Sequence, residues 1–201
     1  YQGYDDRLFG QEPTLGDQRD ALQIPRDAPL ILALGRMIEV KGLHVLVAAA
    51  DLILASRPQA HLVIAGDGPM RPEIQRLVDQ AQARARIHLT GAPPRAAVAR
   101  LFAQADRFVN PGITDAGGRA EGLGITTIEA MASGLACVGS AVGGIPETIT
   151  DNVTGLLIPP GDVQTLADAV GRLVDEPETR RQMGQAARTI ARERFTWPVL
   201  A

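Results

Sequence analysis

The chain has 201 residues, 45% of them hydrophobic, and a formal net charge of −3. This apolar fraction suffices for a folded core, and the lack of clustered Lys and Arg excludes a nucleic-acid surface. The single cysteine, Cys137, excludes an internal disulfide, and no apolar run reaches the roughly 20 residues of a membrane span, so we expect a globular, cytoplasmic protein.

The two ends of the chain differ in composition from its middle. Residues 1–29 are polar, contain proline and lack sustained periodicity, which is typical of a linker that leads into a domain. The sequence opens on Tyr1 and stops at "FTWPVLA", soon after a predicted helix. We therefore interpret it as part of a longer protein: a linker at 1–29, a domain at 30–195 and the start of a further segment at 196–201.

Short apolar runs alternate with amphipathic stretches through the domain. The predicted strands are 30–35, 61–66, 86–91, 107–111, 136–140 and 155–159. The predicted helices are 42–56, 70–84, 94–104, 124–133, 163–175 and 178 to about 194. This alternation predicts an α/β fold with a doubly wound, mainly parallel, Rossmann-like sheet and helices on both faces. Ligands of such sheets bind beyond the carboxyl ends of the strands.

Two cations follow the first predicted strand. Arg36 and Lys41 lie in the loop "GRMIEVKG", where a guanidinium and an ammonium can converge on a diphosphate. Taken alone, the same two side chains also fit solvated surface charges, with Lys41 simply beginning a helix. The loop by itself leaves both interpretations open.

Two acids flank a glycine-rich helix start in "EGLGITTIEAMASG", residues 121–134. Glu121 belongs to the loop and Glu129 to the helix, and Gly122 and Gly124 open the helix N-terminus between them. That terminus offers unpaired N–H groups and a partial positive charge to an anion. Two carboxylates on either side of free backbone N–H groups suit a ligand that carries hydroxyls on either side of a phosphate. Taken singly, both acids also fit ordinary surface positions.

The histidines and the remaining acids form no recognisable catalytic pattern. His44, His61 and His88 have a spacing unlike that of a metal site or a catalytic dyad. A Ser-His-Asp pattern, a zinc signature and a Walker loop are absent from the sequence. We therefore predict structural roles for the histidines and no metal site.

The order of the motifs resembles a known family across nearly the whole chain. It is similar to the C-terminal donor domain of family-4 retaining glycosyltransferases, GT-B enzymes with two facing Rossmann-like domains. The motifs that carry the likeness are "GRMIEVKG", "GDGP", "ADRFVNP", "EGLGITTIEAMASG", "GGIPE", "TGLLIPPGD" and "RFTW". Gly112 departs from the serine common after the proline, and "ITDAGGRA" lengthens the approach to Glu121. Gln2 and Tyr4 depart from the usual pattern of the leading segment.

The resemblance implies a role for each residue of the predicted site. Arg36 and Lys41 would bind the donor diphosphate, Glu121 the transferred sugar, and Glu129 the nucleotide ribose. Backbone near Gly91 and Ala92 would contact the base, and amides of 122–125 the sugar and phosphate. The predicted donor-binding residues are Gly35, Arg36, Lys41, Gly91, Ala92, Glu121, Gly122, Leu123, Gly124, Ile125 and Glu129, with Arg36, Lys41 and Glu121 also assigned to catalysis.

The resemblance also implies the reaction. We expect transfer of a sugar, with retention, from a UDP- or GDP-sugar to a glycan, lipid or small-molecule acceptor in cell-envelope or polysaccharide biosynthesis. No metal or other cofactor is expected. The acceptor, and any peripheral membrane association, would depend on an N-terminal domain absent from this chain, which alone would be inactive. The alternatives are a non-catalytic module that senses a nucleotide sugar, and an epimerase or phosphorylase of similar architecture.

Overall fold

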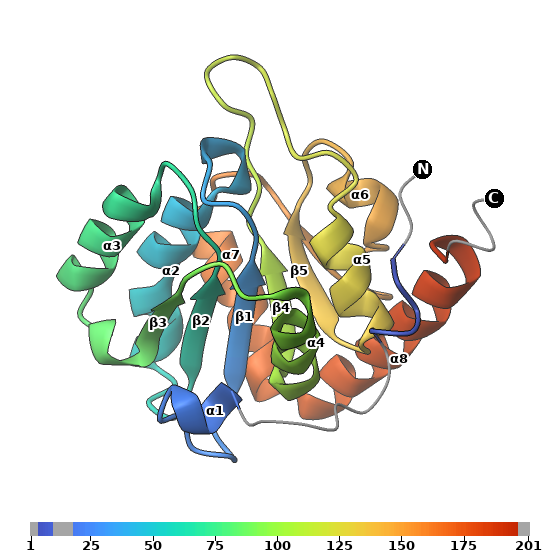
Figure 1. Ribbon diagram of the computed structural model, residues 1–201, viewed down its shortest axis with the longest axis horizontal. Coiled ribbons are helices and arrows are strands. Elements are labelled where there is room, and N and C mark those ends of the chain that lie inside the picture. Colours follow the sequence, from blue (N-terminus) through green and yellow to red (C-terminus); the bar gives the residue numbers. More distant parts are fainter. Residues whose placement is uncertain (1–3, 10–17, 197–201) are drawn as a thin grey trace.

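A six-stranded parallel sheet forms the centre of the molecule (Figure 1). The computed structural model describes residues 4–9 and 18–196. The strand order is β3-β2-β1-β4-β5-β6, and the sheet confirms the predicted Rossmann-like α/β class. The strands are β1 (Leu30–Leu34), β2 (His61–Ala65), β3 (Ile87–Thr90), β4 (Arg107–Asn110), β5 (Ala136–Ser140) and β6 (Gly155–Ile158).

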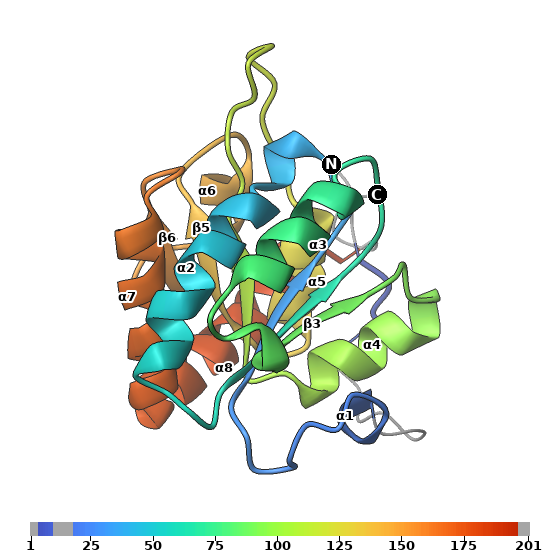
Figure 2. The ribbon, with the colours of Figure 1, turned by 90° about the vertical axis from the view of Figure 1, so that its left-hand side faces the viewer.

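Helices cover both faces of this sheet (Figure 2). Residues of α2, α3 and α7 bury their apolar sides in one core cluster, and those of α4, α5, α6 and much of α8 lie in the other. The helices are α1 (Gln18–Ala21), α2 (Leu43–Ala55), α3 (Arg71–Gln80), α4 (Arg95–Gln104), α5 (Ile125–Ala132), α6 (Ile145–Thr148), α7 (Val163–Asp175) and α8 (Pro177–Arg194), with short 3-10 turns at η1 (Glu39–Lys41) and η2 (Arg84–Arg86).

The central strands are buried on both sides because helices cover both faces of the sheet, and most of their residues are apolar. Every residue of β4 and β5 is buried, and so are the first four residues of β1. A half-exposed antiparallel strand would instead alternate apolar and polar residues. This burial is why the sequence pattern located all six strands within one residue of their observed ends.

Two short helices and one helix end were not predicted. The helices α1 and α6 have four residues each, too few to show a 3.6-residue period. The helix predicted at 70–84 ends at Gln80, because Ala81 has an extended backbone and a 3-10 turn follows. These corrections leave the order of the larger elements unchanged.

The described part of the leading segment packs onto the domain. Tyr4 and Phe9 are buried in the core cluster that contains α4 and α8, and Phe9 meets the ring of Phe102 edge on at 5.9 Å. The amide of Tyr4 donates to the carbonyl of Phe195 at the end of α8. Residues 1–3 and 10–17 of the predicted linker, and 197–201 of the predicted C-terminal segment, lie outside the described residues.

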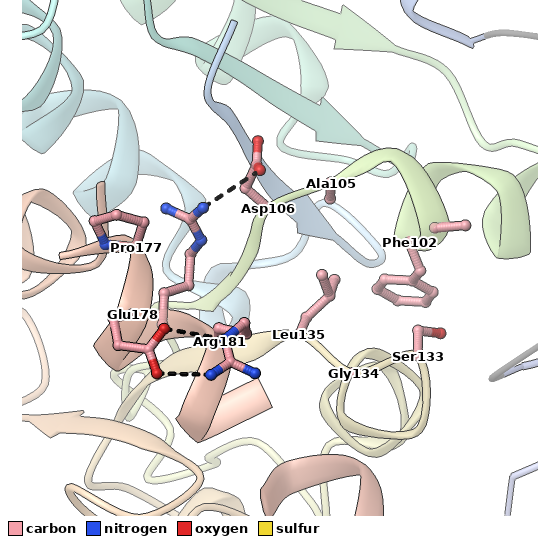
Figure 3. A pocket seen from close by; sticks show the side chains of 11 residues that line it. Phe102, Ala105, Asp106, Ser133, Gly134, Leu135, Pro177, Glu178 and Arg181 are labelled. Atoms are coloured by element: carbon pink, nitrogen blue, oxygen red, sulfur yellow. Dashed lines mark hydrogen bonds and ion pairs between the residues drawn. The ribbon is translucent and has the colours of Figure 1, made fainter. Parts of the chain in front are cut away.

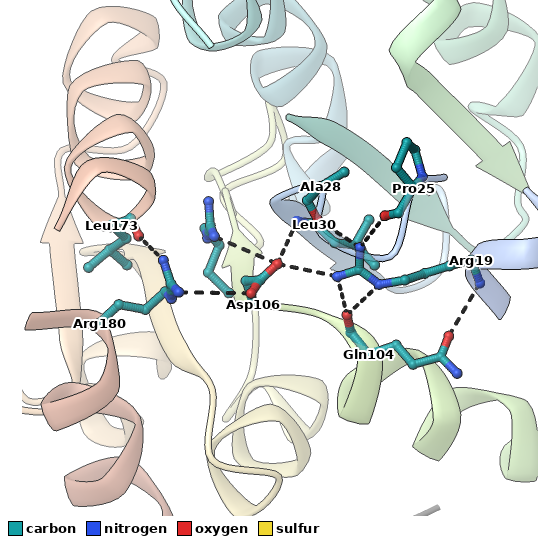
Figure 4. Close-up of polar contacts among 9 residues, drawn as sticks. Arg19, Pro25, Ala28, Leu30, Gln104, Asp106, Leu173 and Arg180 are labelled. Carbon is teal, nitrogen blue, oxygen red and sulfur yellow. Dashed lines mark hydrogen bonds and ion pairs between the residues drawn. The ribbon is translucent and has the colours of Figure 1, made fainter. Parts of the chain in front are cut away.

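Asp106 joins this leading segment to the sheet at the amino end of β4 (Figure 4). Its carboxylate accepts from the amide of Leu30 at 2.6 Å and lies 3.4 Å from the guanidinium of Arg19. Arg107 and Arg180 approach it at 3.8 and 3.9 Å. Burial lowers the pKa of Arg107 to about 10, and Asp106 opposes that shift. One carboxylate thus compensates three cations from three segments.

We predict that Asp106→Ala lowers the free energy of unfolding by about 3 kcal/mol, because Arg107 would keep a buried charge without a counter-ion. Urea unfolding of the chain measures this change. The matched control is Asp27→Ala, an exposed acid whose side chain makes no hydrogen bond or ion pair with the described residues. A loss at Asp106 no larger than at Asp27 would contradict the role assigned to the network.

Candidate functional site

The strand order determines where the predicted site residues can meet. The connections from β1 to β2 and β3 run to one side, while β4 pairs with β1 on the other side. The switch point of the sheet therefore lies between β1 and β4. The loops that leave the carboxyl ends of these two strands carry Lys41 and Glu121, so the fold brings together two predicted residues that are 80 positions apart in sequence.

The two loops touch backbone to backbone. The amide of Ile113 donates to the carbonyl of Val40 at 3.0 Å. Gly42 has φ +60°, and a Cβ at this position would overlap the carbonyl of Pro111. A glycine is required here, and it lets the turn that carries Lys41 lie directly against the segment that leads to Glu121.

Lys41 and Glu121 form an ion pair at this switch point. Both side chains are largely shielded, at 18% and 11% exposure. The stem of Lys41 lies over Gly35, whose Cβ position is 3.4 Å from Lys41 Cε. The backbone of Glu121 is held as well, since its carbonyl accepts from the amide of Gly144 at 3.1 Å. The pair is therefore fixed from both sides.

The N-terminus of α5 lies between the two predicted acids and is uncapped. Gly124 occupies the N-cap position with φ +70°, and no side chain caps the helix. The amides of 122–126 make no hydrogen bond with the residues that the structure describes. Asn110, at the end of β4, donates to the buried hydroxyl of Thr127 at 3.0 Å and so anchors the first turn. The expected anion site thus has free donors on a fixed helix.

Glu129 lies one helical turn further along α5 and is almost completely buried, at 2% exposure. Its Oε1 is 2.8 Å from Nη1 of Arg95, the first residue of α4, whose side chain is 56% exposed. Burial raises the pKa of Glu129, and the charge of Arg95 opposes this shift. The carboxylate is therefore no ordinary surface acid, and a single exposed cation stands beside it.

The remaining predicted residues lie at the same edge of the sheet without joining these pairs. Arg36 is exposed, and its guanidinium makes no hydrogen bond or ion pair with the described residues. Gly91 and Ala92 are exposed in the loop between β3 and α4, and the carbonyl of Gly91 accepts from Gly66 at 3.1 Å. Whether these residues, or the two ion pairs, contact a ligand stays a prediction.

Sequence reasoning missed three residues that shape the site. Gly143 and Gly144 pack against the backbone of 121–122 and hold it in place. Arg95 neutralises Glu129, and its position just after the third strand, in "GAPPR", parallels that of Arg36 after the first. The position of Arg95 just after a strand could have marked it as a candidate site residue. Its pairing with Glu129 on α5 depends on tertiary packing, which the sequence pattern does not show.

The lengthened loop before Glu121 stands out from the carboxyl edge in both ribbon views (Figures 1 and 2). Asp115 organises it, accepting from the amides of Gly117 and Arg119, both at 2.9 Å, and from the guanidinium of Arg119 at 2.8 Å. These hydrogen bonds lower the pKa of Asp115. This loop is therefore a hydrogen-bonded turn, and its last residues lead directly into Glu121.

The histidines lie elsewhere. His61 and His88 stack on adjacent strands with Nδ1 and Nε2 3.0 Å apart, and burial lowers the pKa of both. Within residues 4–9 and 18–196, no three His, Cys, Asp or Glu side chains gather into a group able to hold a metal ion. In the same part of the chain, no helix has the length and apolar character needed to cross a bilayer.

A cleft of about 540 Å³ lies at the opposite, amino edge of the sheet (Figure 3). The end of α4, the turn after α5 and the start of α8 line it. Its charged groups are already paired, Arg181 with Glu178 at 2.7 Å and Arg180 with Asp106 at 3.9 Å. The carboxyl edge, with its free amides, is therefore the better candidate for an anionic ligand.

Comparison with known families agrees with this fold. Residues 16–190 match the family described as "Glycosyl transferases group 1". This chain belongs to the group 1 glycosyltransferases. The match covers the whole sheet and both ion pairs at its carboxyl edge.

Individual relatives of this glycosyltransferase domain are about twice as long. A GDP-mannose-dependent alpha-(1-6)-phosphatidylinositol monomannoside mannosyltransferase of Mycolicibacterium smegmatis is 33% identical, over 85% of this chain and 45% of its own length. The sucrose-phosphate synthase of Thermosynechococcus elongatus superposes with a TM-score of 0.82 at 32% identity, covering 99% of this chain and 48% of that one. The chain thus spans less than half of each.

A third neighbour supports the fold alone. An Anabaena protein crystallised in complex with UDP-glucose superposes with a TM-score of 0.85 at 23% identity, covering 98% of this chain and 52% of that one. The parallel sheet with helices on both faces is accordingly that of GT-B glycosyltransferases. One half of such a structure corresponds to the chain described here.

We predict that Gly143→Ala disrupts the site of this glycosyltransferase domain, because a Cβ there would overlap the carbonyl of Glu121. Gly161→Ala is the matched control, since Gly161 also has positive φ, +78°, but open space around it. The left-handed backbone should cost both variants about 1 to 2 kcal/mol of unfolding free energy. In urea unfolding, Gly143→Ala should lose clearly more. Equal losses would show that the contact with Glu121 does not constrain the loop.

Proposed function

We propose that this chain is the donor-binding half of a retaining family-4 glycosyltransferase. Its donor would be a UDP- or GDP-sugar, and its acceptor a glycan, lipid or small molecule held by the other half of the protein. Family membership and the GDP-mannose-dependent relative support a nucleotide-sugar donor. Retention is proposed from the motif resemblance.

One observation carries the proposal: two shielded acids, each beside one cation, lie on either side of an uncapped helix N-terminus. A nucleotide diphosphate sugar presents the complementary pattern, a diol on the ribose, two phosphates and further hydroxyls on the sugar. Buried carboxylates accept hydrogen bonds from hydroxyls, while free amides and cations bind phosphate oxygens. The order of groups along the chain, Glu121, the free amides of α5 and then Glu129, would match the order of sugar, phosphates and ribose in the donor.

Lys41, Arg36 and the amides of 122–125 would hold the diphosphate. An ammonium has three donors, so Lys41 can keep Glu121 and still donate to a phosphate oxygen. Arg36, without a partner among the described residues, is available for a second phosphate oxygen. The dipole of α5 adds to the attraction, as at other helix N-termini that bind anions.

The two acids would read different parts of the donor. Glu129 would accept from the ribose diol, and Glu121 from a hydroxyl of the transferred sugar. Gly91 and Ala92, which are exposed beside α4, would contact the base through their backbone. In this arrangement the donor would lie along the carboxyl edge of the sheet, with its base near the end of β3 and its sugar at the switch point.

Catalysis would depend on charge that develops as the glycosidic bond to phosphate breaks. The diphosphate gains negative charge as it leaves, and fixed donors that already point at it stabilise that charge most in a site shielded from water. The leaving phosphate would take the proton of the acceptor hydroxyl on the same face, which retains the configuration. The cations of the chain would serve this role without a metal or cofactor, and the chain alone would bind donor without transferring it.

We predict that Glu129→Gln weakens binding of both a nucleoside diphosphate and its sugar, because ribose is common to both. Glu121→Gln should leave the bare diphosphate nearly unchanged and weaken only the sugar-bearing donor. Losing a hydrogen bond to a charged acceptor costs about 1.5 to 3 kcal/mol, which is roughly tenfold or more in affinity. Calorimetric titration with UDP, UDP-glucose, GDP and GDP-mannose measures both effects.

Glu73→Gln, an exposed acid in the first turn of α3, is the control and should bind as the wild type does. If the Glu121 variant loses the bare diphosphate as badly as the Glu129 variant, the division of roles is wrong. If the wild type binds none of the four ligands, the proposed function itself fails.

A further inference from the structure

Arg95 is the cation that stands beside Glu129, and its own position is fixed from a third segment. Its guanidinium carbon lies 5.0 Å from the ring centroid of Phe9, a residue of the leading segment that is buried against the domain. A guanidinium over an aromatic face is held by the ring quadrupole. The side chain is thus directed toward Glu129 although more than half of it is exposed.

The pairing leaves part of the carboxylate open. Nη1 of Arg95 approaches Oε1 of Glu129, and no hydrogen bond from the described residues occupies Oε2. A carboxylate has more acceptor sites than one guanidinium nitrogen can fill. Glu129 can therefore keep Arg95 and still accept from a hydroxyl of a ligand.

We propose that Arg95 is a positioning residue of the nucleotide site, which orients the Glu129 carboxylate toward the ribose diol and supplies its counter-charge. This inference rests on the proposed function, because it assumes that Glu129 binds the ribose. Arg95 acts through Glu129 and does not itself contact the reacting atoms. The leading segment, through Phe9, contributes to the donor site in the same way.

The charge of Arg95 matters because Glu129 is buried. Burial favours the neutral acid and raises its pKa, while Arg95 favours the charged form. The other elements packed against α5 carry titratable groups that form no ion pair or hydrogen bond with Glu129: Arg107 on β4, Cys137 on β5, Glu147 on α6 and Arg188 on α8. Without Arg95, Glu129 would take up a proton at higher pH.

The first test is the pH profile of nucleotide binding. UDP and GDP are titrated into the wild type, Arg95→Gln and Arg95→Lys from about pH 8 to about pH 5. Over this range Arg95→Gln should lose severalfold more affinity than the wild type loses, because without the charge of Arg95 the Glu129 carboxylate takes up a proton at higher pH. Arg95→Lys, which keeps the charge, should recover most of the wild-type profile.

The 2′-deoxy nucleotide identifies the group involved. Wild type should prefer the ribonucleotide, and Arg95→Gln should lose this preference as the pH falls, while Glu129→Gln lacks it throughout. An Arg95→Gln variant that weakens binding equally at every pH would place Arg95 on the nucleotide itself. An Arg95→Gln variant that binds as the wild type does at every pH would show that the Arg95–Glu129 contact is a surface ion pair without a role in binding. Either result overturns the proposal.

A second test needs no ligand, so it separates this inference from the proposed function. A buried acid whose folded pKa is raised contributes stability below its unfolded pKa and loses it as pH rises through the folded pKa. The difference in unfolding free energy between wild type and Arg95→Gln should therefore grow from about pH 5 to about pH 8. In a Glu129→Gln background this growth should vanish. A pH-independent difference, or one that persists in that background, would contradict the coupling even if no nucleotide binds.

Discussion

The pairing of β1 with β4 is the constraint on which the site depends. These strands are adjacent in the sheet, yet the paired residues Ile31 and Arg107 are 76 positions apart in sequence, so only the doubly wound order brings their loops together. Gly42 then allows these two loops to approach backbone to backbone, and Gly143 lets the loop after β5 pack against the backbone of Glu121. Lys41 and Glu121 meet because of this close approach, and the free amides of α5 open into the same place.

Electrostatics gives this geometry its chemical character. The chain is acidic overall, yet each shielded acid of the site has one cation beside it. Burying a carboxylate without such a partner favours its neutral form. The two ion pairs at the carboxyl edge place carboxylates that can accept from hydroxyls close to groups that can donate to phosphate. At the opposite, amino edge of the sheet, Asp106 compensates three arginines, and this network contributes to stability.

The sequence predicts the sheet well and the site in part. Buried strands appear as short, mainly apolar runs and amphipathic helices have a 3.6-residue period, so the chain order of the larger elements and most of their limits followed from pattern alone. Motif resemblance indicated Lys41, Glu121 and Glu129, and the fold places the first two in contact. The pairing of Arg95 with Glu129, the packing of Phe9 and the His61–His88 contact joined distant segments through tertiary packing. No local pattern encodes such contacts, and helices as short as α6 leave no period to detect.

A crystal structure of the chain with bound UDP or GDP tests the central claim most directly. The account predicts the phosphates at the amides of 122–125 beside Lys41, and the ribose diol on Glu129 with Arg95 still paired to it. A nucleotide bound in the cleft at the amino edge, or at the carboxyl edge with its ribose away from Glu129, would contradict it.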